Sequence, residues 1–240
     1  MTRGAQFRKV LFFVVVLASR VMSPQSTASQ NDVGEVRLHI VPSEPGNFRA
    51  VPAVIWLQPQ AGTPTPPFPP HQQYTLLQKN RMFLPHLQVI PVNAVVKFPN
   101  ADPFFHNVFS LFDGKRFDLG LYEAGSTKSV TFPREGVSYI FCNIHPEMSA
   151  VVIALSTPLY AVDNATNSFT LRNVPPGDYS LHVWIEGLQP SFLEQLTRRV
   201  HIIPGKVDLG PIVAPISQHG ILSHANKFGK PYTPDPQSIY

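Results

Sequence analysis

The chain has a single cysteine, Cys142, among its 240 residues, so no intrachain disulfide can form. None of its nine histidines is followed by another histidine two positions later. Charged residues make up only 14% of the chain, and no long stretch shows the 3.6-residue periodicity of an amphipathic helix. These absences exclude a disulfide framework and a mainly helical fold, and they leave one unpaired thiol to be explained.

The amino-terminal residues 1–28 have the features of a secretory signal peptide. A basic beginning precedes the apolar run 10–18, and Ser26 and Ala28 supply the small residues of a cleavage site. The apolar run is too short to span a bilayer. We therefore expect cleavage near Ala28 and a periplasmic or secreted mature protein without a membrane span, with an uncleaved anchor as the alternative.

The formal net charge of +4 does not indicate nucleic-acid binding. Four of the 19 basic residues belong to the signal peptide, so the remaining 15 balance the 15 acidic residues: the four are Arg3, Arg8, Lys9 and Arg20. A neutral mature chain lacks the basic footprint that phosphate backbones require. The sequence thus predicts no nucleic-acid partner.

The pattern of the mature chain predicts an all-β protein. Short runs rich in valine, isoleucine and phenylalanine alternate with proline, glycine, asparagine and aspartate, which is typical of a sandwich. The predicted strands are 35–41, 53–57, 87–91, 94–98, 107–111, 128–132, 138–142, 150–155, 159–162, 168–171, 178–185 and 199–203.

Proline-rich sequence suggests where the domains divide. Six prolines between residues 59 and 70 predict an extended linker rather than a central strand. The predicted divisions are a first β segment at 33–57, a linker at 58–76, a β domain at 77–155, a second β module at 156–205 and an irregular tail at 206–240. The segment 33–57 either supplies the first strands of the module at 156–205, so that the domain between them is an insertion, or stands alone.

The segment 141–148 contains three soft or borderline metal donors. Cys142, His145 and Met148 lie within seven residues at the end of a predicted strand. A second imidazole would complete the set of two histidines, one thiolate and a weak axial thioether that holds copper for electron transfer. His106, in an apolar segment earlier in the chain, is the candidate. We therefore predict one copper ion per chain, bound by His106, Cys142, His145 and Met148.

Other interpretations of these residues stay open. A lone cysteine and a methionine are often only core packing, and zinc takes cysteine and histidine as ordinary ligands. The thioether favours copper, because it is a soft donor that suits copper(I). His86 could approach the same site, but we expect a structural role for it because the ligand set is already complete.

The segments around His106 and Cys142 resemble the cupredoxin family, and the C-x-x-H-x-x-M loop most resembles that of the amicyanins. The resemblance implies a Greek-key β-sandwich with type 1 copper, in which the side chain of Asn107 ties the two ligand loops together. The whole chain is similar to bacterial periplasmic cupredoxin-like proteins of the methylamine-utilization type. The segment 169–184 resembles a carboxypeptidase-regulatory or transthyretin-like β-sandwich, with a turn at Pro176-Gly177.

The resemblance implies an electron carrier rather than an enzyme. Its partner would be a redox protein such as a cytochrome or a dehydrogenase. Multicopper enzymes need additional copper held by paired histidines, and such pairs are missing here. The alternative is a copper-binding structural protein, or one that binds the cell envelope through its β module, without an electron-shuttle role.

Overall fold

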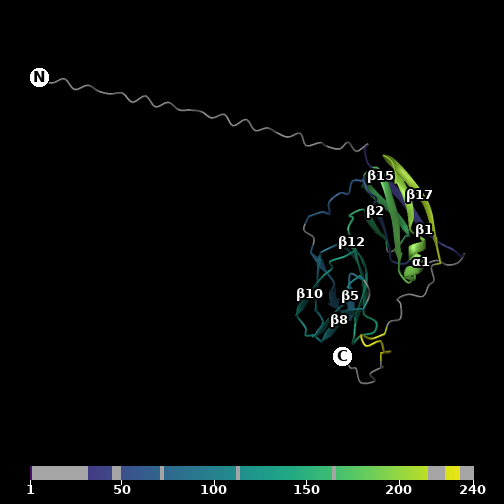
Figure 1. Cartoon of the computed structure of the whole chain (residues 1–240). Coiled ribbons are helices and arrows are strands. Elements are labelled where there is room, and N and C mark those ends of the chain that lie inside the picture. Colours follow the sequence, from purple (N-terminus) through teal and green to yellow (C-terminus); the bar gives the residue numbers. More distant parts are fainter. Residues whose placement is uncertain are drawn as a thin grey trace.

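The computed structural model describes residues 32–44, 50–70, 73–111, 114–163, 166–215 and 225–232, together with Met1. Almost all of the regular structure in these residues is β-strand, and the strands form two lobes (Figure 1). The predicted all-β fold class is therefore confirmed. The signal peptide predicted at 1–28 lies, apart from Met1, outside the described residues, and none of the described helices is long and apolar enough to cross a membrane.

The first sandwich contains both the earliest and the latest strands. One sheet has the order β14 (Ser168–Val174), β1 (Gly34–Pro42), β17 (Gly205–Ala214). The facing sheet has the order β13 (Tyr160–Asp163), β2 (Ala53–Pro59), β15 (Gly177–Ile185), β16 (Arg198–Ile202), with the short helix α1 (Pro190–Gln195) between its last two strands. The first and last strands pair in parallel, β1 with β17.

The second sandwich is built from the strands in between. Its smaller sheet has the order β10 (Thr127–Thr131), β7 (Val95–Pro99), β3 (Tyr74–Thr75). Its larger sheet has the order β6 (Leu87–Pro91), β12 (Ser149–Leu155), β11 (Gly136–Cys142), β8 (His106–Ser110), β9 (Phe117–Tyr122). A hairpin of β4 (Leu77–Lys79) and β5 (Met82–Leu84) completes this lobe.

All twelve predicted strands coincide with observed ones within a few residues. The expectation of an irregular tail from residue 206 is wrong for 206–214, because these residues form most of β17. In the sequence, Gly210 and Pro211 are residue types that commonly form turns. However, β17 is an edge strand that pairs only with β1 in its sheet, and an edge position tolerates proline because one side of the strand makes no ladder.

Strands buried on both faces join the two sandwiches. In β12, Ala150, Val152 and Ala154 face the core of the second sandwich. The alternate residues Val151, Ile153 and Leu155 pack in a separate cluster with Val54 of β2 and Trp184 of β15. Side chains alternate between the two faces of a strand, so a continuous apolar run such as that of β12 needs a cover on each side. The first sandwich supplies the outer cover.

An ion pair lies at the same junction. His86 Nε2 is 2.5 Å from Glu186 Oε1, and His86 Nδ1 is 3.1 Å from the carbonyl oxygen of Ser149. The hydrogen bond to Glu186 raises the pKa of His86 above its ordinary 6.5, against the opposing effect of burial. Its role is therefore structural within the described residues, as it links the segment before β6 to the residue after β15.

The raised pKa of His86 predicts a pH-dependent contribution to stability. Because the pKa of His86 is higher in the folded than in the unfolded chain, the ion pair stabilises the folded state. This stabilisation is fully present below the unfolded-state pKa near 6.5 and is lost as the pH rises through the folded-state pKa. We expect the substitution His86→Gln to lower the melting temperature more at about pH 5.5 than at about pH 8.5. The two decreases should differ by about 2 °C. Differential scanning calorimetry at the two pH values measures this difference. His201→Gln, which removes an exposed pair with Asp178, is the control, and an equal difference at both pH values would contradict the assignment.

Candidate metal centre

Strand geometry brings three of the predicted ligands together. His106 begins β8, Cys142 ends β11, and these neighbouring antiparallel strands pair with Cys142 opposite Val108. His145 lies in the short loop between β11 and β12, and this loop turns back because the Met148 amide donates to the His145 carbonyl. A residue at the start of one strand and a residue at the end of its antiparallel neighbour lie at the same end of the two strands.

The donor atoms of these residues form a compact triangle. Cys142 Sγ lies 3.7 Å from His106 Nδ1 and 3.6 Å from His145 Nδ1, and the two Nδ1 atoms are 3.2 Å apart. Metal–sulfur bonds of about 2.3 Å and metal–nitrogen bonds of about 2.0 Å place tetrahedral donors roughly 3.3–3.6 Å from one another. The three side chains could therefore hold a metal ion between them.

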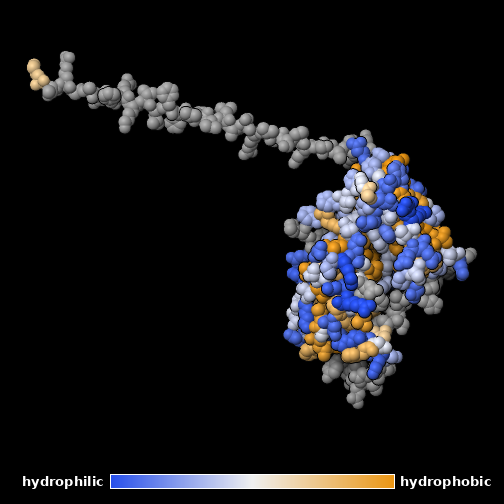
Figure 2. Space-filling view, viewed as in Figure 1, coloured by the Kyte–Doolittle hydropathy of each residue, from blue (hydrophilic) through white to orange (hydrophobic). Residues whose placement is uncertain are grey.

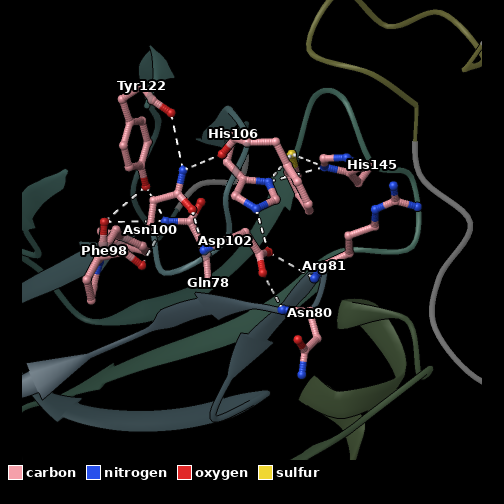
Figure 3. Close-up of polar contacts among 12 residues, drawn as sticks. Gln78, Asn80, Arg81, Phe98, Asn100, Asp102, His106, Tyr122 and His145 are labelled. Atoms are coloured by element: carbon pink, nitrogen blue, oxygen red, sulfur yellow. Dashed lines mark hydrogen bonds and ion pairs between the residues drawn. The ribbon is translucent and has the colours of Figure 1, made fainter. Parts of the chain in front are cut away.

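The ring of His106 is oriented by Asp102. His106 Nε2 donates to Asp102 Oδ2 at 2.8 Å, and both side chains are almost fully buried. A proton on Nε2 leaves Nδ1 with a free lone pair, and Nδ1 is the atom that faces Cys142 and His145. Figure 3 shows Asp102 below His106, with His145 on the other side of the ring. The carboxylate thus fixes the tautomer that a metal requires.

A tight hairpin holds that carboxylate in place. Asn80 and Arg81 form the two-residue turn between β4 and β5, and both have a φ of 56°. Their amides donate to the two carboxylate oxygens of Asp102 at 2.6 and 3.0 Å (Figure 3). Burial raises the pKa of Asp102, but the Arg81 amide, His106 and the Asn80 amide together outweigh it and leave the pKa below 3.8. Asp102 therefore stays ionised as an acceptor for His106.

The loop that connects Asp102 to His106 is also fixed by hydrogen bonds. Asn100 Oδ1 accepts from the Asp102 amide at 3.0 Å, and Asn100 Nδ2 donates to the Phe104 carbonyl at 2.8 Å. The ring of Phe104 contacts both histidine rings, with centroids 5.2 Å from His106 and 5.5 Å from His145. Such a rigid support keeps the donor geometry from relaxing when the charge of a bound ion changes.

The environment of Cys142 combines burial with amide dipoles. The side chain is fully buried, and burial raises the pKa of its thiol. Backbone amides of Asn107, Ile144 and His145 point to the sulfur and partly oppose this effect. A metal cation would supply the remaining stabilisation of the thiolate, since a coordinating thiol is deprotonated outright.

The two histidines differ in their access to solvent. His106 is completely buried, whereas His145 is half-buried. Burial, followed by the proximity of His106, lowers the pKa of His145. Of the residues next to the two histidines in the chain, Ile144 is 43% and Phe105 56% exposed, and the acidic Glu147 is exposed as well. Figure 2 shows hydrophobic residues among polar ones on the visible surface of this lobe.

Met148 ends the ligand loop, and Asn107 directly follows His106 in β8. Met148 is fully buried in the core of the second sandwich, and its carbonyl accepts from the Cys142 amide at 3.2 Å. The Asn107 side chain donates to Asp118 Oδ1 at 2.6 Å, whereas its carbonyl accepts from the Asn143 amide at 3.4 Å. The link between the two ligand loops that the resemblance assigned to the Asn107 side chain is thus made here by its main chain.

The structure brings the predicted ligands His106, Cys142 and His145 together, whereas the residues that support them were not predicted from the sequence. Asp102 lies four residues before His106, but its role depends on the Asn80-Arg81 turn, which is remote in sequence. Two other histidines lie away from this cluster: His182 stacks on Trp56, and His201 pairs with Asp178. His219 and His224 lie outside the described residues.

No protein-family model and no curated protein match the chain. Solved structures similar to parts of it include a purple cupredoxin from Nitrosopumilus maritimus, with 23% identity, covering 35% of this chain and 100% of that one at a TM-score of 0.32. Amicyanin from Paracoccus versutus has 22% identity over 37% of this chain and 86% of its own, at a TM-score of 0.32. A copper-containing nitrite reductase from Thermus scotoductus has 24% identity over 41% of this chain and 25% of its own, at a TM-score of 0.34.

Proposed function

We propose that this chain is a type 1 copper protein that transfers single electrons between protein partners. The observation that carries the proposal is the compact triangle formed by the Cys142 sulfur and the Nδ1 atoms of His106 and His145. The donor set mixes a soft thiolate with two imidazoles, and such a set suits both oxidation states of copper. Met148, predicted as the weak axial ligand, begins the return from the same loop into β12.

Copper is favoured over zinc by the donors and their surroundings. A structural zinc site in a protein commonly has four strong ligands from cysteine and histidine. The cluster here has three such residues within the described part of the chain, and the nearby fourth candidate is a thioether. Bound copper would supply a one-electron redox couple at this position. The protein's own residues hold the donors, exclude water and keep the ligand geometry constant.

Constant geometry is the property that fast electron transfer needs. Asp102 locks the His106 ring, the hairpin amides lock Asp102, and Phe104 packs against both imidazoles. Few atoms can therefore move when the charge at the site changes. The half-buried edge of His145 is the natural point of electron exit, and exposed Phe105 and Ile144 beside it offer a small apolar surface for brief contact with a cytochrome or a dehydrogenase.

Localisation and reaction class follow from the same proposal. An exported protein with a signal peptide at 1–28 would receive copper and meet its redox partners in the periplasm or outside the cell. We infer no independent catalysis, because a site with four protein donors leaves no open position for a substrate. Electron transfer between proteins needs no such position.

A copper titration tests the proposal directly. The full chain from residue 29 onward is mixed with one equivalent of copper(II), and its visible absorption and electron paramagnetic resonance spectra are recorded. We expect an intense thiolate-to-copper band and narrow copper hyperfine splitting at one copper per chain. A weak band typical of ordinary copper(II), or no binding, would overturn the assignment.

Replacing Met148 by leucine is expected to retain copper and to raise the reduction potential. Leucine removes a donor and leaves an apolar side chain, which disfavours the more highly charged copper(II) state. A tenfold weaker hold on copper(II) relative to copper(I) corresponds to about 59 mV, which a redox titration followed by the visible band resolves. Met82→Leu, at a half-exposed methionine of β5, is the control. An unchanged potential would exclude Met148 as a ligand.

A copper-binding protein without a shuttle role is the second candidate. It is favoured by the first sandwich, which packs on the copper-binding lobe through a buried apolar cluster and is more than a minimal carrier needs. Stopped-flow mixing with a reduced c-type cytochrome separates the two functions. Rapid, reversible electron exchange supports the carrier, whereas stable copper retention without exchange supports the structural role.

A further inference from the structure

The segment 225–232 returns to the metal centre after the last strand of the first sandwich. Figure 1 shows it in yellow against the end of the second sandwich, close to β8. Tyr232 Oη donates a hydrogen bond of 2.7 Å to the carbonyl oxygen of Cys142. The Lys227 amide donates to Asn143 Oδ1 at 2.9 Å. Two consecutive residues, one of them the thiol ligand, are thus held by a segment far along the chain.

The same segment also reaches the strand of the first histidine. Lys227 Nζ lies 2.7 Å from Asp118 Oδ2. The other oxygen of Asp118 accepts from Asn107 Nδ2 at 2.6 Å, and Asn107 directly follows His106 in β8. The Lys227 amide therefore contacts Asn143, which follows Cys142. The Lys227 side chain is connected through Asp118 to Asn107, which follows His106. Both ligand-bearing strands are connected to Lys227.

The segment also contains hydrogen bonds of its own, which hold it in a turn. Asn226 Oδ1 accepts from the amides of Phe228 and Lys230 at 3.0 and 3.1 Å, and the Asn226 amide donates to the Lys230 carbonyl at 2.8 Å. Gly229 closes the turn with a φ of 73°, a conformation that costs glycine little. A preformed turn loses less conformational entropy when its side chains bind.

We propose that residues 225–232 form a strap that positions the Cys142 end of β11, with Tyr232 and Lys227 as positioning residues that keep the ligand loop closed. The loop 143–148 must open for a metal ion to leave or for a reagent to reach the fully buried sulfur. The Lys227 amide holds Asn143 within this loop, Tyr232 holds Cys142 where the loop begins, and the ion pair with Asp118 keeps Lys227 in place. Its role in retaining copper rests on the proposed function, whereas its closure of the loop does not.

The reactivity of the thiol tests the strap without any metal. Cys142 is the only cysteine, so a disulfide reagent such as dithiobis(nitrobenzoate) reports on this site alone. In the metal-free full chain, we expect Tyr232→Phe to react about three to ten times faster than the unaltered chain, because a lost hydrogen bond favours local opening by about that factor. Tyr179→Phe loses an equally short bond, to the carbonyl of Pro175 in the first sandwich, and should react at the unaltered rate.

A second pair of variants separates the strap from general stability. Lys227→Met removes the contact to Asp118, and Lys230→Met is its control in the same turn. We expect only Lys227→Met to accelerate thiol modification, with unchanged circular dichroism for both. If Tyr232→Phe and Lys227→Met both react within about twofold of their controls, the strap is disproved.

Copper release distinguishes failure of the strap from failure of the proposed function. In the copper-loaded chain, we expect Tyr232→Phe to release copper to an excess of chelator about three to ten times faster and to shift the thiolate-to-copper band. If the unaltered chain gives no such band, the proposed function fails while the thiol rates still decide on the strap. If the band forms and neither rate changes in the variants, the strap fails alone.

Discussion

Replacing Cys142 by alanine is expected to abolish the intense visible band and to weaken copper binding more than about a hundredfold. The size follows because supporting residues alone change metal affinity by about 10- to 100-fold, and this change removes a ligand. The sulfur is one of the three atoms of the donor triangle, and it belongs to the only thiol in the chain. Absorption spectra and competition with a chelator measure the two effects.

The matched control for this variant is Val108→Ala. Val108 is fully buried and lies opposite Cys142 in the β8–β11 pairing, so its truncation leaves a comparable void and removes no donor. Val108→Ala should lose stability but keep the band. A Cys142→Ala protein that keeps its colour, or a Val108→Ala protein that loses it, would show that packing rather than ligation controls the spectrum.

Replacing Trp184 by alanine is expected to lower the free energy of unfolding by about 3–5 kcal/mol. Trp184 is 1% exposed, packs between the two sandwiches and donates from its indole nitrogen to Tyr139 Oη at 3.2 Å. Its loss leaves a void at the junction and removes the hydrogen bond to Tyr139. Urea denaturation followed by circular dichroism measures the change. The transition should also broaden, because lobes that no longer support each other unfold separately.

Two further variants sharpen this test. Trp184→Phe keeps much of the packing and removes the hydrogen bond, so its cost should be well below that of alanine. Trp56→Ala truncates a partly buried tryptophan at the margin of the same cluster, where it stacks on His182. A cost below about 1 kcal/mol for Trp184→Ala would mean that the sandwiches do not depend on this contact.

The strands and the grouping of the candidate ligands were predictable because both depend on local sequence patterns. The alternation in β15 places Tyr179, Leu181 and Val183 in one core, and the short loop from Cys142 to Met148 keeps three candidate ligands together. Asp102 was missed because only the fold brings the Asn80-Arg81 turn to it. The residue types alone do not identify the acceptor that orients a histidine.

The sequence also does not indicate which residues pack against each apolar face of a strand. The run 150–155 indicates a strand buried on both sides, but it does not say that Val54 and Trp184 cover the outer one. The edge strand β17 was hidden by Gly210 and Pro211, whose usual meaning as turn residues does not hold at a sheet edge. The domain boundaries and the metal itself remain predictions.

The parallel pairing of β1 with β17 has a consequence for the order of folding. Gly34 must meet Gly205 before the first sandwich can close, and so long a loop makes closure slow and late. The second sandwich is continuous from β3 to β12 and needs no residue from the far end of the chain for its own sheets. We therefore expect the candidate ligands His106, Cys142 and His145 to be assembled in the part that forms first. Residues 225–232 follow β17, so they reach the ligand loop only after the whole chain is in place.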